Sequence, residues 1–368
     1  MKKLYVIKAI QKMLKSNDLL EKSREREEDF TRKSKLDFLS LVMIILTLVR
    51  KSMQIELDCF FEKNVKKGKP FSKQVFSKAR KKLLPEAFIL LNDLFVERYY
   101  DDGNFKTIKG YRIFGVDGSM LELPNTAKIK DEFGVQTNQS TKIEIPTARI
   151  STLFDVLNRT IFDAKIDSFH GNEREMAKLH LEKLEIINKK SNVRVKDLLI
   201  FDRGYPSINL IYSLLIQKKY FLMRVSKSFV KEFNSFVQSS SREEILEVTL
   251  TKSRIKECDL KSINSAITEN EMIRIRALKI TLDSGETEYL LTNLIEDFIY
   301  DDFKELYFLR WSIETNYDFL KNKIEIENFS GKTAVSVKQD FHAAIFVCNL
   351  ALLIATEAQN ELGISKKN

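Results

Sequence analysis

The sequence is poor in the residues that build disulfide frameworks and soft-metal sites. Its 368 residues include only three cysteines and three histidines. Cys59, Cys258 and Cys348 stand far apart without a Cys-x2-Cys pair, so their spacing indicates neither a disulfide framework nor a zinc cluster. The three histidines argue against an imidazole-based metal centre and leave carboxylates as the ligands for any metal. This cysteine usage fits a reducing cytosol.

Long apolar runs are also scarce. Residues 41–49 and 343–355 form the longest ones, and they are too short, or too interrupted by Asn349, to span a bilayer. We expect both to be buried core helices. The first residues, Met-Lys-Lys-Leu, lead into charged residues and not into an apolar segment, so no secretory signal is expected. The sequence therefore predicts a cytoplasmic protein without a membrane partner.

Positive charge is concentrated at one end of the chain. The composition, 43% hydrophobic and 31% charged, is that of a folded globular protein long enough for two or three domains. The net charge is +9, and residues 1–100 carry 23 Lys and Arg against 13 Asp and Glu. Segregated positive charge favours a polyanionic partner, with nucleic acid as the usual one and anionic lipid as its main rival.

The basic end has a helical pattern. Residues 1–104 contain almost no glycine or proline, and apolar residues recur every three or four positions, which predicts an all-helical domain. Within it, residues 71–83 place basic side chains beside apolar ones, as in a helix that lies on DNA. These candidate DNA-binding residues are Lys73, Lys78, Arg80, Lys81 and Lys82. A solvated helix face would show the same pattern equally often.

From residue 105 the pattern changes to alternating strands and helices. Three strands are expected in residues 111–123 and 143–169, followed by a helix at 172–188. A strand at 197–201, a helix at 207–218 and a strand at 220–225 come next. This order predicts an α/β fold with a ribonuclease H-like catalytic core, although other α/β folds share parts of it.

The predicted core is interrupted. Residues 105–227 form its first part, residues 228–295 a mostly β insertion with strands near 245–251, 273–281 and 288–292, and residues 296–360 its second part. The second part begins with a helix from 297 to about 323 and ends with a helix from about 335 to 358.

Four polar residues share one face of the predicted 297–323 helix. Tyr307, Arg310, Glu314 and Lys321 fall within an arc of about 60° at 100° per residue. Glutamate offers a hard oxygen ligand to a metal, while the other three side chains can grip phosphate oxygens. An ordinary ion pair between Arg310 and Glu314 would need neither Tyr307 nor Lys321.

Two aspartates are expected at strand ends in the same region. Asp117 closes the first predicted strand and Asp202 the fourth, and these strands are neighbours in a ribonuclease H-like sheet. Taken singly, an aspartate that closes a strand is more often a turn or cap residue. Together with Glu314, the pair would form a carboxylate triad that holds two divalent cations about 4 Å apart for phosphodiester chemistry.

The four helical residues carry a resemblance to a known family. Tyr-x2-Arg-x3-Glu-x6-Lys is the hallmark of the insertion-sequence-four (IS-four) family of bacterial DDE transposases, and Tyr307, Arg310, Glu314 and Lys321 match it at every spacing. Residues 116–119, 201–205, 328–333 and 339–341 also resemble that family. The resemblance covers about residues 70–355.

The resemblance implies a DNA-cutting enzyme. Asp117, Asp202 and Glu314 would be catalytic and would bind two Mg2+ ions, with Mn2+ as a substitute. Tyr307, Arg310 and Lys321 would grip the terminal phosphates. The enzyme would act as a homodimer in the bacterial nucleoid, cleave double-stranded DNA at terminal inverted repeats through a hairpin, and join the 3′-OH ends to target DNA.

Three functions remain open at this point. The first is the cut-and-paste transposase just described. The second is a DNA-binding regulator derived from a transposase that no longer cleaves, and the third is a structure-specific nuclease of the same fold. Some relatives stack a flipped base on an aromatic residue. No residue is assigned to that role here, because the only tryptophan, Trp311, lies inside the signature helix.

Overall fold

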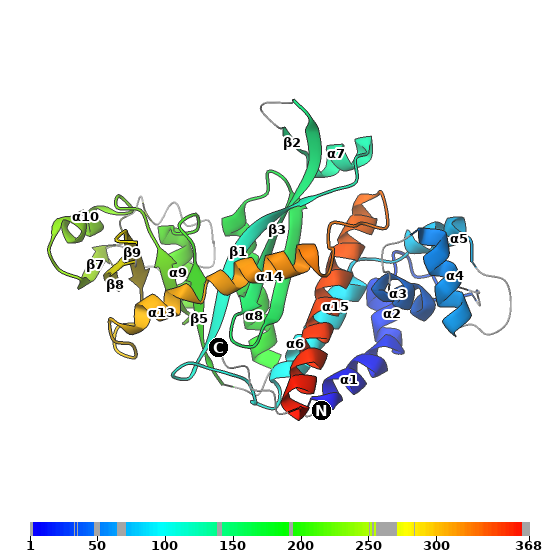
Figure 1. Cartoon of the computed structure of the whole chain (residues 1–368), viewed down its shortest axis with the longest axis horizontal. Coiled ribbons are helices and arrows are strands. Elements are labelled where there is room, and N and C mark those ends of the chain that lie inside the picture. Colours follow the sequence, from blue (N-terminus) through cyan, green and yellow to red (C-terminus); the bar gives the residue numbers. More distant parts are fainter. Residues whose placement is uncertain are drawn as a thin grey trace.

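The computed structural model describes most of the chain. The described residues are 3–32, 34, 36–47, 52–64, 71–137, 142–190, 194–249, 251, 254, 271–282 and 284–362. Cys258 and part of the predicted β insertion lie outside them. A large mixed sheet occupies the middle of the molecule, and the N-terminal helices lie at one end of it (Figure 1).

The described strands form one sheet. They are β1 (Tyr111–Glu122), β2 (Val135–Thr137), β3 (Glu144–Asp155), β4 (Thr160–Ser168), β5 (Lys196–Phe201), β6 (Tyr220–Arg224), β7 (Glu243–Thr249), β8 (Met272–Thr281) and β9 (Thr287–Thr292). Their order is β2-β3-β1-β5-β6-β9-β8-β7, and β4 pairs with β3. β1 is parallel to β5, and β5 is parallel to β6. The prediction that the first and fourth strands of the core are neighbours is confirmed.

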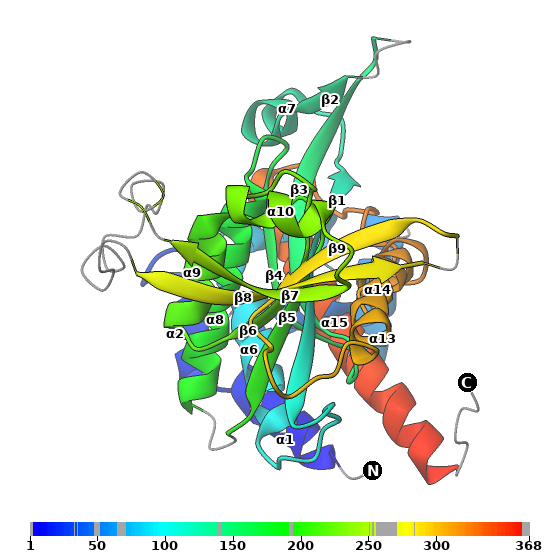
Figure 2. The ribbon, with the colours of Figure 1, turned by 90° about the vertical axis from the view of Figure 1, so that its left-hand side faces the viewer.

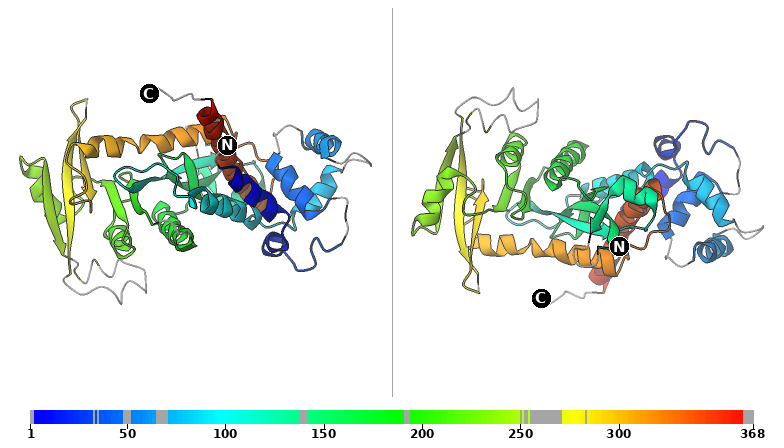
Figure 3. Two further views of the ribbon diagram at one scale, coloured as in Figure 1. Left: turned by 90° about the horizontal axis from the view of Figure 1, so that it is seen from below. Right: turned by 90° about the horizontal axis from the view of Figure 1, so that it is seen from above.

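Helices cover both faces of this sheet (Figure 3). They are α7 (Ala127–Phe133), α8 (Glu173–Lys190), α9 (Ile208–Ile216), α10 (Lys231–Gln238), α13 (Asp302–Phe308) and α14 (Trp311–Asn322). Along β5, Leu199 and Phe201 pack with the cluster that includes α8 and α9, whereas Leu198 and Ile200 pack with the cluster that includes α13 and α14. Because successive side chains of a strand point to opposite faces, an uninterrupted apolar run is what a strand buried on both sides requires.

The strands of the insertion continue the central sheet. β9 pairs with β6 from Arg224↔Leu290 to Leu222↔Thr292, and β8 and β7 follow beyond it. In Figure 2 these strands lie in front of β5 and β6. The expected β strands are therefore present, while α7, β2 and α10 were not predicted. The boundaries of the domains stay a prediction.

The N-terminal part is helical wherever the structure describes its elements. Its helices are α1 (Leu4–Leu14), α2 (Asn17–Ser23), α3 (Phe38–Thr47), α4 (Met53–Asn64), α5 (Lys73–Arg80) and α6 (Glu86–Tyr100). They share one apolar cluster with α8, α9 and one face of the sheet. This shared core attaches the helices to the sheet.

The last helix, α15 (Ala334–Glu361), lies between the sheet and the N-terminal helices (Figure 1). It contributes Phe346 to the apolar cluster on the α6 side and Phe341 to the cluster on the α14 side. Residues 334–359 are long and apolar enough to cross a membrane by length and composition alone, and half of their most apolar window is buried inside the molecule. Both properties are also those of a core helix.

The prediction of a single helix at 297–323 is wrong in two respects. The helical segment begins at Asp302 and not at 297. It is divided into α13 and α14, with a tightened turn at Leu309 and Arg310. The amide of Arg310 donates to the carbonyl of Tyr307 at 3.0 Å, and the amide of Ile313 donates to the carbonyl of Arg310 at 3.0 Å. Both bonds span three residues and not four, as in a short 3₁₀ segment. The spacing of the signature residues nevertheless remains nearly helical, because Leu309 and Arg310 keep right-handed helical dihedrals.

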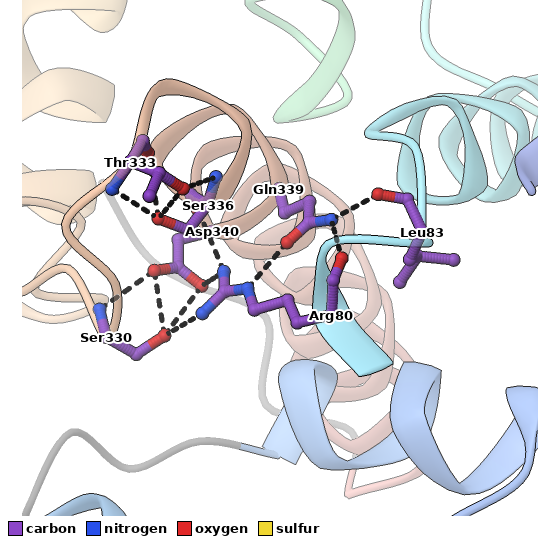
Figure 4. Close-up of polar contacts among 7 residues, drawn as sticks. All are labelled: Arg80, Leu83, Ser330, Thr333, Ser336, Gln339 and Asp340. Carbon is purple, nitrogen blue, oxygen red and sulfur yellow. Dashed lines mark hydrogen bonds and ion pairs between the residues drawn. The ribbon is translucent and has the colours of Figure 1, made fainter. Parts of the chain in front are cut away.

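One predicted DNA-binding residue is part of the core instead. Arg80 is 5% exposed, and its guanidinium is enclosed by the segment before α15 and the first turns of that helix (Figure 4). It donates to Gln339 Oε1 at 2.5 Å, to Ser330 Oγ at 2.6 Å and to the carbonyl of Ser336 at 2.8 Å, and it pairs with Asp340 Oδ1 at 2.6 Å. All these groups lie more than 240 positions away in the sequence, so spacing alone could not reveal that Arg80 joins α5 to α15.

We expect Arg80→Met to lower the free energy of unfolding by about 3–5 kcal/mol, because the buried Asp340 carboxylate would lose its cation. Urea denaturation at pH 7 measures the loss. Lys81→Met is the matched control, since Lys81 is the next residue and is exposed; it should change stability by less than about 0.5 kcal/mol. Equal effects of the two substitutions would contradict the buried role of Arg80.

Candidate active site

Two aspartates meet where β1 and β5 run side by side. Asp202 follows β5 directly, and Asp117 lies one residue beyond the last parallel pair, Val116↔Phe201. The expectation that Asp117 closes its strand is wrong. β1 continues to Glu122 because its other edge remains paired with β3. Asp117 therefore marks the end of the β1–β5 ladder and not the end of β1.

Neighbouring groups hold the backbone of Asp117 in place. Its carbonyl oxygen accepts hydrogen bonds from the Tyr317 hydroxyl at 2.6 Å and from Ser151 Oγ at 3.2 Å. Its carboxylate Oδ1 accepts a hydrogen bond from the amide of Gly118 at 2.8 Å. Because Tyr317 belongs to α14, these contacts attach that helix to the strand at the position of the aspartate.

The carboxylate of Asp117 lies in an unfavourable electrostatic environment. Its pKa is raised from the ordinary value of 3.8 to about 6, mainly by burial and to a smaller extent by the charges of Asp202 and Glu173. The Gly118 amide and the charge of Arg310 act in the opposite direction. Carboxylates that crowd one another in this way are stabilised by a cation or by the loss of one charge.

The four residues of the signature are all near this point, but they have separate partners. The Tyr307 hydroxyl donates to Asp202 Oδ1 at 3.2 Å. Arg310 Nη1 pairs with Glu314 Oε1 at 2.9 Å. Lys321 Nζ donates to the carbonyl of Met120 on β1 at 2.7 Å. The signature therefore lies along β1 and the end of β5.

Tyr307 and Arg310 can both donate hydrogen bonds to a ligand at this site. Burial, together with the charge of Asp202, raises the pKa of Tyr307, so its hydroxyl keeps its proton. Arg310 is 6% exposed, and its buried Nε has no hydrogen-bond partner among the described residues. A buried guanidinium N–H without a partner is costly and indicates a place where an acceptor can bind.

The predicted basic residues lie in α5 and in the two positions that follow it, and α5 is at the far end of the molecule from α13 (Figure 1). Lys73, Lys78 and Lys81 are exposed. Lys82 is also exposed, but it pairs with Asp29 at 2.8 Å. Without Arg80, four of the five candidate residues remain on the surface.

Residues 108–350 match the family model for the transposase DDE domain. This segment is well over half of the chain. The chain belongs to the DDE transposase family. Such enzymes cleave DNA and transfer the cut strands to a target.

Two solved structures show a distant likeness. The cryo-EM structure of the piggyBac transposase synaptic complex with hairpin DNA matches 95% of this chain and 74% of that chain, at 12% identity and a TM-score of 0.44. A crystal structure of Ciona intestinalis endonuclease V with inosine-containing DNA matches 77% of this chain and 100% of that chain, at 8% identity and a TM-score of 0.22. No curated protein sequence matches. The family assignment therefore rests on the sequence match.

DDE transposase domains use divalent metals, generally Mg2+. The donor chemistry of Asp117 and Asp202 fits such an ion, because Mg2+ takes one or two carboxylates and keeps several waters. In the described part of the chain, however, no three His, Cys, Asp or Glu side chains are grouped closely enough to hold a metal. The expected convergence of three carboxylates is thus incomplete in this transposase structure. Glu314 is held by Arg310, and it would have to exchange that partner to join the aspartates.

Sequence reasoning missed a fourth acidic residue near the aspartates. A Cβ placed on Gly118 would lie 3.0 Å from Glu173 Oε1, and one placed on Gly204 would lie 4.0 Å from Glu173 Oε2. Glu173 is in the first turn of α8, far from both aspartates in the sequence. Only the two glycines that follow the aspartates hinted at a close approach of some group.

We expect Asp117→Asn to stabilise the metal-free transposase at pH 7 by about 1–3 kcal/mol, as judged by urea denaturation in EDTA. With a folded-state pKa of about 6, the ionised carboxylate opposes folding at neutral pH. The gain should shrink as the pH falls from 6 towards 4, because the wild-type side chain then takes up its proton. Asp131→Asn, at an exposed position of α7, should change little. Lower stability of Asp117→Asn at pH 7 would contradict an unfavourable environment for the buried Asp117 carboxylate.

Proposed function

We propose that this DDE transposase is a cut-and-paste enzyme of the IS-four family that acts on the terminal inverted repeats of a bacterial insertion sequence. The observation that carries the proposal is the position of the Tyr-x2-Arg-x3-Glu-x6-Lys residues against the two aspartates. Tyr307 contacts Asp202, and Lys321 contacts β1 three residues beyond Asp117. Spacing that is typical of a family thus coincides with a shared location in space.

The fold proposed for the catalytic part is ribonuclease H-like. The strand order β4-β3-β1-β5-β6, with β1, β5 and β6 parallel and β3 antiparallel to β1, supports it. We propose residues 105–227 and 296–360 as its two parts, residues 228–295 as a β-rich insertion, and residues 1–104 as a DNA-binding domain.

We propose that Asp117, Asp202 and Glu314 are the catalytic carboxylates. When bound, two divalent cations would activate the attacking oxygen and stabilise the leaving oxygen. In the cleavage step an oxygen of water forms a bond to phosphorus while the bond to the 3′-oxygen breaks. In the joining step the freed 3′-oxygen forms a bond to a phosphorus of the target, while the bond from that phosphorus to the target's own 3′-oxygen breaks and this oxygen leaves as a 3′-hydroxyl.

The donors of the signature would bind the phosphate. The unpartnered Nε of Arg310 and the protonated hydroxyl of Tyr307 offer two N–H or O–H groups beside the aspartates. A phosphate that binds Arg310 competes with Glu314 for the same guanidinium, because both are anions. DNA binding and the release of Glu314 towards the aspartates would therefore be coupled.

A hairpin intermediate and a homodimer belong to the proposal by resemblance to the family. The enzyme would work on DNA in the bacterial cytoplasm, and the basic N-terminal helices would recognise the repeats. Lys73, Lys78, Lys81 and Lys82 remain the candidates for that contact.

The catalytic assignment is tested on a supercoiled plasmid that carries the gene with its natural flanking DNA. With Mg2+ we expect wild type to nick at the flanks and to transfer the freed ends to a second plasmid, while Ca2+ should support little cleavage. Asp117→Ala, Asp202→Ala and Glu314→Ala should reduce nicking to the level without enzyme, whereas Asp131→Ala should behave as wild type.

The same assay separates the three candidate functions. Triad variants as active as wild type would refute the catalytic assignment. DNA binding without nicking by wild type would favour a regulator, and nicking without strand transfer would favour a nuclease.

The DNA contact of α5 is tested by salt dependence. Replacing Lys73, Lys78 and Lys81 together by Ala should weaken binding to the flanking DNA. If each lysine neutralises one phosphate, the slope of log K against log salt should become shallower by about 2.7, at about 0.9 per contact. The control is a triple Ala variant of the exposed Lys189, Lys190 and Lys231 on α8 and α10. Slopes that match wild type in the α5 variant would assign the DNA contact to another surface.

A further inference from the structure

Glu173 reaches the point where the two aspartate-bearing strands end. Its carboxylate faces Gly118, the residue after Asp117, and Gly204, two residues after Asp202. A Cβ on Gly118 would lie only 3.0 Å from Glu173 Oε1, which is tighter than ordinary van der Waals contact. The missing side chain at Gly118 therefore leaves the space that the Glu173 carboxylate uses.

The position of Glu173 is set by several anchors. Arg149 on β3 forms an ion pair with the Glu173 carboxylate, and Arg149 Nε donates to the carbonyl of Phe169 at 3.3 Å. The next residue, Arg174, donates from Nε to the carbonyl of Gly204 at 3.1 Å. These contacts join the start of α8 to the loop that carries Asp202. With its side chain 34% exposed, Glu173 still reaches solvent.

The electrostatic environment of Asp117 agrees with this geometry. After burial, the charges of Asp202 and Glu173 both raise the pKa of Asp117. Three negative groups thus act on one location, with Arg149 beside Glu173, Arg224 at 3.9 Å from Asp202 and Arg310 at its border. Such an arrangement attracts a divalent cation more strongly than two aspartates do.

Resting on the proposed function, we propose that Glu173 is a fourth carboxylate of the active site, which holds the waters of a cation bound by Asp117 and Asp202. Mg2+ keeps several of its waters, and a carboxylate beyond direct contact accepts hydrogen bonds from them. This role is compatible with the spacing of the acidic side chains, which do not form a close group of three. Glu173 is then a positioning residue that raises the affinity for the ion without contacting DNA.

A purely structural role for Glu173 explains less. An acidic residue in the first turn of a helix is favourable in itself, but Glu175 in the same turn already supplies one. Glu175 pairs with Lys178 at 2.8 Å and is 58% exposed, away from the tight contact at Gly118. The interaction with the helix N-terminus therefore does not explain why a second carboxylate lies so close to the strand that carries Asp117.

The test measures the binding of Mn2+ alone to the full chain without DNA, with free Mn2+ followed by electron paramagnetic resonance. Glu173→Gln keeps the shape and an acceptor for Arg149 but removes the charge, and we expect its dissociation constant to rise about tenfold. Glu175→Gln, the matched control, should bind Mn2+ as wild type does. Asp117→Asn, which removes a direct ligand, should bind more weakly than either.

A kinetic readout separates positioning from folding. In the nicking assay, Glu173→Gln should need more Mg2+ for half-maximal rate while its rate at saturating Mg2+ stays within a fewfold of wild type. Glu173→Asp keeps the charge but withdraws it from Gly118, so it should lie between wild type and Glu173→Gln. If circular dichroism shows that Glu173→Gln does not fold, Glu173→Asp replaces it as the test of the proposed role.

The Mn2+ measurements distinguish failure of the role of Glu173 from failure of the proposed metal site. If Asp117→Asn weakens Mn2+ binding while Glu173→Gln and Glu173→Asp bind within twofold of wild type, the role of Glu173 is refuted and the proposed function stands. An equal loss in Glu175→Gln would also refute it, because the effect would then be one of general charge. If Asp117→Asn itself binds Mn2+ as wild type does, the proposed metal site fails.

Discussion

The parallel pairing of β1 with β5 organises the candidate active site. It brings Asp117 and Asp202, 85 positions apart in the chain, to the same end of one ladder. Everything else near the site is arranged around that end: α14 attaches to it through Tyr317, and α13 through Tyr307. A shift of the pairing by one residue would move one aspartate to the opposite face of the sheet.

The acidic and basic side chains of the site are unevenly distributed. Asp117, Asp202 and Glu173 accumulate negative charge on one side, while Arg310 holds Glu314 on the other. This distribution suits the proposed function, in which the enzyme would bind both cations and DNA. A bound cation would relieve the repulsion among the carboxylates, and a phosphate bound to Arg310 would free Glu314. The two ligands would therefore favour each other's binding. The cost of the crowded carboxylates is met by the large apolar clusters on both faces of the sheet.

The way the N-terminal helices are joined to the catalytic part matters for any DNA-bound state. Arg80 connects α5 to the start of α15, and the polar groups that receive it belong to residues 330–340. Three of the residues that bind Arg80, namely Ser330, Gln339 and Asp340, belong to stretches that resemble the family. The exposed lysines of α5 are held at a defined place relative to the sheet.

Local sequence pattern was enough to predict the helical or strand periodicity of most elements, the position of Asp202 after a buried strand, and the spacing of the signature, because these depend on neighbouring residues. It predicted the exposed lysines of α5 and the buried Arg80 alike, since all five residues have the same local pattern. The folded arrangement was needed to show that Arg80 is enclosed, that β1 continues past Asp117, that Glu314 pairs with Arg310, and that Glu173 approaches the aspartates. Each of these depends on partners from distant parts of the chain, and burial and pairing of that kind leave no trace in local spacing.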